Sequence, residues 1–115
     1  MEHLLKQREK LIKKLVSNAK AILSNQISLP LGIARMGTTI TWIENIERLP
    51  NINLQILLEY NNLTAKYFIG TERLMCNKDF LIEQDKELDK ITMMNKDKLI
   101  SKCYEILELF EAKEK

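Results

Sequence analysis

The stretch from Thr71 to Phe110 constrains the fold more than any other, because it is forty residues long and contains neither proline nor glycine. Its apolar residues recur at helical intervals between charged positions, which is the pattern of a helix that buries one stripe of its surface. A helix over 78–112 would be about 50 Å long at 1.5 Å per residue. That length exceeds what one small core covers, so we expect the helix either to bend or to leave part of its surface for a partner. The stripe consists of Leu81, Leu88, Leu99, Cys103, Ile106 and Phe110.

The remaining sequence predicts three shorter helices, and so an all-α fold. At 115 residues, with 45% hydrophobic and 30% charged residues, the chain is long enough to bury a core as one domain. We therefore expect a single compact domain over 1–115, in which helices at about 2–24, 29–47 and 53–68 pack against the long helix at 78–112. The third of these is apolar on more than one side, which favours a central position. Whether the long helix continues through Thr92–Asn95 is left open by the pattern.

Local signals mark the ends of these helices. Asn25 follows the last apolar position of the first helix and can adopt the left-handed conformation that closes a helix. Ser28 is suited to cap the second helix, with Pro30 tolerated in its first turn. Pro50 disfavours helical backbone in the residue before it, so the second helix should end near that point. Asn77 is expected to cap the long helix, because its side-chain oxygen can accept a free backbone N–H.

Glycine and cysteine positions give two further expectations. Gly32 and Gly37 each weaken the second helix, so we expect them to permit the close approach of a neighbouring helix. Cys76 and Cys103 form no C-x-x-C motif and lie in apolar helical contexts, so both are interpreted as buried thiols. The N-terminus shows no export signal, and no uncharged apolar run approaches the ~20 residues of a membrane span. The expected location is therefore cytoplasmic, without contact to a membrane.

The sequence offers no set of residues suited to catalysis. His3, the only histidine, lies at the N-terminus, so Ser-His-Asp and Cys-His arrangements are not expected. Two cysteines 27 positions apart do not form a zinc site, and Glu-x-x-His pairs for a di-metal centre are missing. A glycine-rich phosphate loop is also missing. We accordingly predict no catalytic, metal-binding or cofactor-binding residues, and binding is favoured over enzyme activity.

Three surfaces are candidates for binding. Trp42 lies out of phase with the apolar stripe of its helix, which suits either an interface anchor or the edge of the core. The long helix carries an acidic set interleaved with Lys86 and Lys90, which is typical of a solvated face and alternatively suits a basic partner. The first helix carries a row of lysines that could follow a phosphate backbone, although no Phe, Tyr or Trp residues interleave with it to stack on bases. The acidic set is Glu83, Asp85, Glu87 and Asp89, and the lysines are Lys6, Lys10, Lys13 and Lys14.

The second half of the chain resembles a group of small, all-helical bacterial proteins without an assigned activity. The resemblance rests on IGTERLMCNKDFLIEQDKELDKI and KDKLISKCYEILELF, in which a Gly-x-x-Arg turn precedes an Asn-capped long helix that ends in a cysteine and a Leu/Ile-rich tail. The segment AKAILSNQISLPLGIARM resembles the group's first turn and glycine-containing second helix. Two departures stand out: Asn25 replaces a common glycine, and Tyr67-Phe68 replaces a common Leu-Pro.

The resemblance implies an immunity protein, which neutralises a cognate antibacterial toxin by occupying or covering its active site and performs no chemistry itself. The expected interface is the exposed side of the long helix together with Trp42. The net charge of +2 is a point against mimicry of a nucleic acid by the whole surface. Two alternatives stay open: a nucleic-acid-binding module that uses the lysine row, and a helical bundle that forms a homodimer through the surplus length of its last helix.

Overall fold

Four α-helices make up most of the chain in this computed structural model, which describes residues 2–111. They are α1 (Glu2–Leu23), α2 (Leu29–Ile46), α3 (Gln55–Thr64) and α4 (Lys78–Ile106). A 3-10 turn, η1 (Thr71–Met75), precedes α4, and a π-helical turn, η2 (Leu107–Glu111), follows it. The described residues contain no strand. The expected all-α fold, with three shorter helices and one long C-terminal helix, is confirmed.

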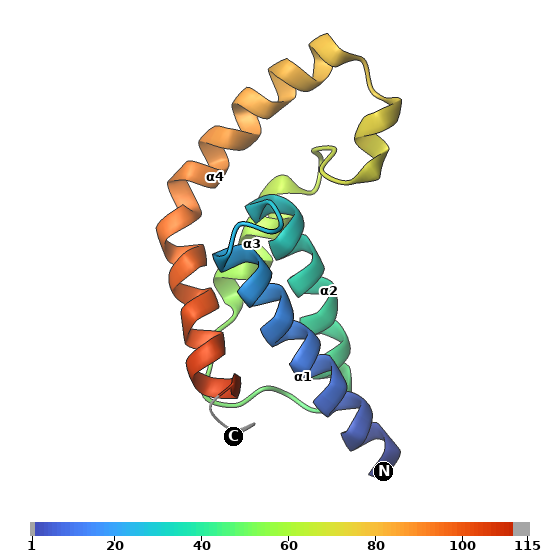
Figure 1. Cartoon of the computed structure of the whole chain (residues 1–115), viewed down its shortest axis with the longest axis vertical. Helices are drawn as coiled ribbons and strands as arrows, with labels where there is room; N and C mark the ends of the chain where they lie inside the picture. Colours follow the sequence, from blue (N-terminus) through green and yellow to red (C-terminus); the bar gives the residue numbers. More distant parts are fainter. Residues whose placement is uncertain (1, 112–115) are drawn as a thin grey trace.

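The helices α1 and α2 lie side by side and antiparallel along the long axis of the molecule (Figure 1). Their connection has the predicted geometry. Asn25 has a φ of 61°, in the left-handed region, and closes α1. The Ser28 hydroxyl accepts a hydrogen bond from the backbone N–H of Leu31 at 3.4 Å, which caps α2. The end of α1 and the start of α2 are determined by residues within a few positions of them, so the sequence alone could predict both.

The loop after α2 is held against α1 by a single arginine. Arg8 donates through Nε to the carbonyl of Glu47 at 3.1 Å and through Nη2 to the carbonyl of Arg48 at 3.2 Å. Pro50 follows two positions later, and Asn51 then takes a φ of 63°. The chain therefore leaves α2 at the expected place and turns back toward α3.

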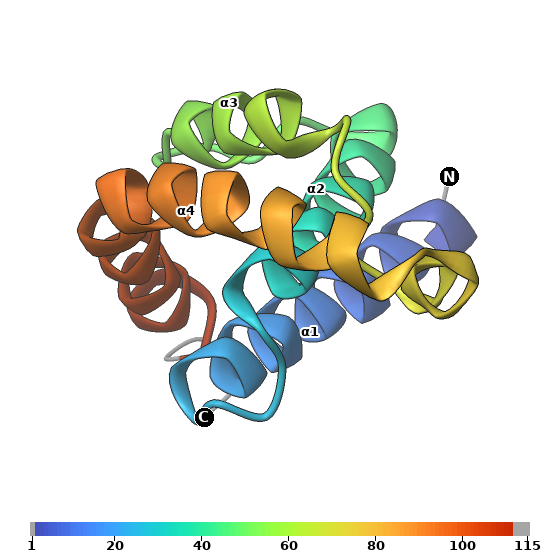
Figure 2. The same ribbon diagram turned by 90° about the horizontal axis from the view of Figure 1, so that it is seen from above.

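The third helix is shorter and less central than the sequence predicted. It begins at Gln55, whose backbone N–H donates a hydrogen bond to Oδ1 of Asn53 at 2.9 Å. At its other end, the hydroxyl of Thr64 donates back to the carbonyl of Tyr60 at 2.9 Å, and the N–H of Tyr67 donates to the carbonyl of Thr64 at 3.0 Å. These bonds favour a turn over a continued helix. The ten-residue α3 packs on α2 and α4 at the edge of the fold, opposite α1 (Figure 2).

The long helix α4 is continuous through Thr92–Asn95 but bends in its middle, so its two halves run in different directions (Figures 1 and 2). Two contacts fix this region. The hydroxyls of Tyr60 and Thr92 lie 2.7 Å apart and join α3 to α4. The side chain of Asn95 donates to the carbonyl of Ile91 at 2.8 Å, a bond of the kind that accompanies helix bending.

The core lies between α1, α2, α3 and the second half of α4, and its last member comes from the π-helical turn. No residue between Tyr60 and Leu99 belongs to this buried cluster. The first half of α4 and the segment before it therefore extend beyond the core, toward one end of a molecule measuring 50 × 27 × 23 Å. The buried side chains of this cluster are Leu15, Val16, Ala19, Ile22, Ile33, Met36, Ile40, Ile43, Leu49, Leu54, Leu57, Tyr60, Leu99, Cys103, Ile106 and Phe110.

Candidate functional site

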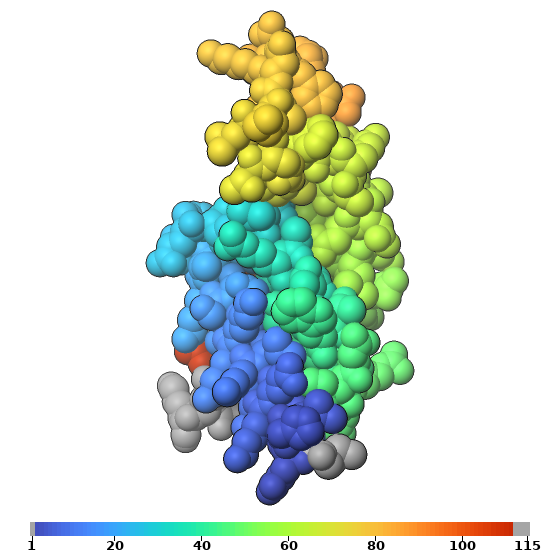
Figure 3. All heavy atoms as spheres, turned by 90° about the vertical axis from the view of Figure 1, so that its right-hand side faces the viewer, coloured from blue at the N-terminus to red at the C-terminus, as the bar shows by residue number. Residues whose placement is uncertain are grey.

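The segment from Phe68 to Phe80, which we call the η1–α4 corner, forms one end of the molecule (Figures 1 and 3). It presents two apolar side chains almost completely to solvent, since Leu74 is 86% exposed and Met75 is 90% exposed. Phe68 and Phe80 are also exposed. Their rings lie 5.9 Å apart, edge to face, and join the loop to the first turn of α4.

Two polar side chains of α4 hold this corner in place. Arg73 and Asp85 form a two-pronged pair, in which Nη1 donates to Oδ1 and Nη2 donates to Oδ2, each at 2.8 Å. Arg73 also donates to the carbonyl of Phe68 at 3.1 Å. The buried Gln84 binds both backbone groups of Phe68: its Oε1 accepts from the N–H at 2.7 Å, and its Nε2 donates to the carbonyl at 3.0 Å. We call this set of bonds the corner clamp.

The opposite charges of Arg73 and Asp85 in the corner clamp stabilise each other. The hydrogen bonds from Arg73 lower the pKa of the Asp85 carboxyl below its usual range, and the bonds to Asp85 raise the pKa of Arg73. Glu72 stabilises the turn before η1, because its Oε1 accepts hydrogen bonds from the backbone N–H of Ile69 at 3.2 Å and from that of Gly70 at 3.1 Å. Hydrogen bonding to its own backbone, and then to the N–H groups of Gly70 and Ile69, lowers the pKa of Glu72. Both carboxylates are therefore held in their ionised form.

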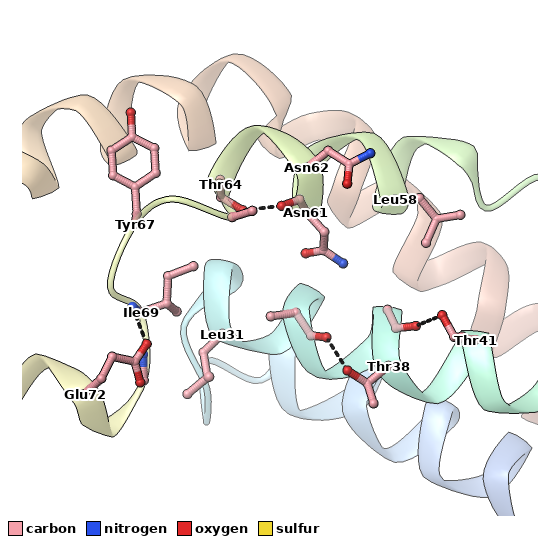
Figure 4. Close-up of a pocket in the computed structure, with 14 residues that line it drawn as sticks. Leu31, Thr38, Thr41, Leu58, Asn61, Asn62, Thr64, Tyr67, Ile69 and Glu72 are labelled. Atoms are coloured by element: carbon pink, nitrogen blue, oxygen red, sulfur yellow. Dashed lines mark hydrogen bonds between the residues drawn. The ribbon is translucent and has the colours of Figure 1, made fainter.

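A groove runs between α2 and α3 beside the corner, and the turn at Ile69–Glu72 closes one end of it (Figure 4). Its volume is about 510 Å³, and the side chains of Leu31, Leu58 and Ile69 supply apolar walls. The Thr41 hydroxyl in this groove donates to the Gly37 carbonyl of its own helix at 3.0 Å.

Asn61 projects from α3 toward α2 inside this groove (Figure 4). Its Nδ2 donates to the carbonyl of Ile33 at 3.0 Å, and a Cβ on Gly37 would overlap the same amide. On the other side of α2, a Cβ on Gly32 would overlap the side chain of Ile22. The expectation that both glycines permit close helix approach is thus confirmed. Within the described residues, the buried Oδ1 of Asn61 has no hydrogen-bond partner.

The four predicted carboxylates of α4 have different surroundings. Asp85 belongs to the corner clamp. Glu83 pairs with Lys86 at 3.0 Å, in the salt-bridged pattern expected of a solvated face. Glu87 accepts a hydrogen bond from the hydroxyl of Tyr67 at 3.2 Å, and Asp89 is exposed. Three of the four carboxylates therefore contact other side chains, and Asp85 orients the loop that carries Leu74 and Met75.

The other predicted residues lie elsewhere on the molecule. Trp42 is 50% exposed, and the ammonium nitrogen of Lys14 lies 5.8 Å from the centroid of its ring. This contact belongs to the paired α1 and α2, whereas the predicted carboxylates lie on the first half of α4, near the other end of the molecule (Figures 1 and 3). The structure therefore does not join Trp42 and these carboxylates in one patch. Lys6, Lys10 and Lys13 are exposed on α1.

The two cysteines differ in exposure. Cys103 is completely buried, and burial raises the pKa of its thiol to about 11. Cys76 is partly exposed, and its thiol donates to the carbonyl of Glu72 at 3.6 Å. The prediction that both thiols are buried is wrong for Cys76, because it ends η1 in the corner and does not take part in a helix that faces the core.

No family model matches the chain, and comparisons with curated proteins and with solved structures give no match either. Within residues 2–111, no group of His, Cys, Asp and Glu side chains is placed to hold a metal ion. In the same range, none of the helices combines the length and apolar character that crossing a membrane requires.

The sequence alone predicted only part of the η1–α4 corner. The Gly-x-x-Arg turn is present, since the N–H of Arg73 donates to the carbonyl of Gly70 at 3.1 Å. The pairing of Arg73 with Asp85 and the burial of Gln84 depend on how η1 folds back on α4, and no local pattern marks them. One signal was available for Leu74 and Met75: they are adjacent apolar residues in a short segment between Gly70 and the helix cap.

Proposed function

We propose that this chain is a non-catalytic protein-binding domain and that the η1–α4 corner is the centre of its binding surface. The observation that carries the proposal is the nearly complete exposure of Leu74 and Met75 on a turn that the corner clamp fixes. The backbone of this turn loses little conformational freedom on binding, and the two exposed side chains gain from leaving water, which is the combination expected of an interface anchor. Methionine also adapts its shape to a partner's surface.

The partner that we propose is a cognate antibacterial toxin, so that the chain acts as an immunity protein. The resemblance of residues 19–110 to small helical bacterial proteins supports this partner class. The corner is continuous with the first turns of α4, where Glu83 and Glu87 lie exposed. Carboxylates at the rim of an apolar contact would speed association with a basic partner and would disfavour acidic ones.

The test is binding to the product of the neighbouring gene, measured by calorimetry with purified proteins. We expect the double variant Leu74→Asp/Met75→Asp to weaken binding about 100-fold or more, because charges would replace the apolar anchors. The matched control is Met93→Asp/Met94→Asp, which changes two side chains that are 68% and 82% exposed elsewhere on α4. Circular dichroism should show that both variants remain folded, since all four positions are exposed.

Two results would contradict the proposal. If the wild-type protein does not bind the neighbouring gene product, the toxin is not its partner. If binding occurs but the corner variant and the control variant lose affinity equally, the corner is not the centre of the interface.

A further inference from the structure

A second groove lies between α1 and α2, and its lining comes from the first half of α1 and the end of α2. These parts of the two helices lie in the half of the molecule opposite the η1–α4 corner (Figure 1). Its volume is about 370 Å³, which is room for one or two side chains of a partner. Leu11, Trp42 and Ile46 contribute apolar side chains to its lining, and Gln7 and Asn45 contribute amides. We call it the Trp42 groove.

The indole of Trp42 lies beside Lys14 of α1. Half of it remains exposed, and the Lys14 ammonium lies over the ring at 5.8 Å from the centroid. A cation at this distance is attracted to the electron-rich ring face. The sequence separates these residues by 28 positions, so only the pairing of α1 with α2 brings the aromatic ring to the lysine row.

Exposed basic residues occur at helical spacing from Lys14 and Trp42, and carboxylates do not occur at the same spacing. On α1, Lys10 lies one turn before Lys14, and on α2, Arg35 lies two turns before Trp42. The positions three, four and seven residues from Lys14 and from Trp42 contain no Asp or Glu. Lys10, Lys14 and Arg35 are exposed, and none forms an ion pair within residues 2–111.

We infer that the Trp42 groove is a second docking site, and that its occupant is an acidic amphipathic helix of a partner protein. One apolar side chain of that helix would enter the groove over Leu11 and Trp42. Its carboxylates would face Lys10, Lys14 and Arg35, where opposite charge favours the encounter and fixes the orientation. These residues are separate from the η1–α4 corner, so the inference does not depend on the proposed toxin partner.

A single-stranded nucleic acid fits the same groove less well. Bases stack on open aromatic faces, and here Lys14 lies over one face of the indole, so at most one face is open for a base. Phosphates also gain nothing from the apolar side chains of Leu11 and Ile46 in the lining. The combination of apolar lining with exposed basic residues on the same two helices therefore favours a protein segment with apolar and acidic faces.

Trp42 is the only tryptophan, so its fluorescence reports directly on this groove. The probe is a synthetic amphipathic 18-residue helix of Leu, Ala and Glu. We expect its addition to the full-length protein to shift the indole emission in a saturable way, with an affinity that falls as salt is added. Lys14→Glu/Arg35→Glu should weaken binding about 10-fold or more. The matched control is Lys86→Glu/Lys90→Glu, which makes the same charge change on exposed residues of α4 and should leave the affinity within about twofold.

Specific outcomes would overturn the inference. These are the absence of an emission change at millimolar Glu peptide, an equal response to a peptide with Lys in place of Glu, and an equal loss of affinity in the control variant. Tighter binding of a 20-nucleotide oligothymidine than of the Glu peptide would assign the groove to nucleic acid instead. Leu74→Asp/Met75→Asp should leave the emission response unchanged, so this result is independent of the test of the proposed function.

Discussion

At the scale of single residues, the contact between Gly37 and Asn61 determines how closely α2 and α3 approach. A Cβ on Gly37 would overlap the Asn61 amide, which donates to the carbonyl of Ile33. Gly37→Ala gains up to ~1 kcal/mol of helix propensity but forces the amide out of its site, at a cost of about 1–3 kcal/mol. We expect a net loss of about 1 kcal/mol in the free energy of unfolding, measured by urea denaturation.

A double-mutant cycle separates this clash from other effects of the substitution. In a background with Asn61→Ala the amide is absent, so Gly37→Ala should stabilise the protein through helix propensity alone. The same loss in both backgrounds would show that the contact between Gly37 and Asn61 is not the cause.

Residues that act on their immediate neighbours were predictable from the sequence, and residues that act across elements were not. Ser28, Asn25 and Asn77 took their predicted roles at helix ends, because each acts on backbone within three positions. Tyr60 is fully buried and bonded to Thr92, 32 positions away. Burial of a tyrosine needs a partner for its hydroxyl, and only the folded position of α4 supplies one.

At the scale of elements, the corner clamp links η1 to α4 by charge as well as by hydrogen bonds. The pKa of Asp85 is lowered in the folded protein, so its stabilising effect is present above the unfolded pKa of about 4 and is lost as the pH falls through the folded value. We expect Asp85→Asn to lower the free energy of unfolding at pH 7 by about 0.5–1 kcal/mol, the range for a partly exposed pair. The difference from wild type should disappear in more acidic solution.

The control for this prediction is Asp89→Asn, which removes the same charge one turn further along α4. The structure gives Asp89 no ion pair within the described residues, so its variant should differ little from wild type at any pH. The pKa of Glu72 is also lowered, so this residue contributes to the pH dependence of stability as well. Because Glu72 is present in the wild type and in both variants, its contribution cancels when their stabilities are compared. A loss for Asp85→Asn that persists unchanged in acid would contradict a charge-dependent clamp.

The element boundaries that the sequence missed are those fixed by tertiary contacts. The apolar pattern predicted a helix to residue 68, but the chain leaves the helix after Thr64 so that Phe68 can pair with Gln84. The same pattern predicted regular helix to residue 112, whereas the backbone becomes π-helical from Leu107. Position 112 lies outside the described residues. Apolar periodicity indicates which face of a helix is apolar, but it does not indicate which neighbouring element will pack against that face.

At the scale of the whole molecule, stability should be unevenly distributed along the chain. The buried cluster draws on α1, α2, α3 and the end of α4, and it includes no residue between Tyr60 and Leu99. The η1–α4 corner instead depends on the corner clamp and on the contact between Phe68 and Phe80. Regions with few buried apolar contacts open locally at lower free energy than the core. The corner should therefore open at a lower free energy than the core, while the corner clamp sets its conformation in the folded state.

Native-state hydrogen exchange tests this distribution directly. We expect amides in residues 68–85 to exchange at least about 100-fold faster, relative to their intrinsic rates, than those facing the core in α1 and α2. Arg73→Lys keeps the charge but cannot form the two-pronged bond to Asp85, so it should accelerate exchange in 68–85 and leave the α1–α2 amides unchanged. Uniform acceleration throughout the chain would mean that the corner and the core open as one unit, and the corner would then be an integral part of the folded core.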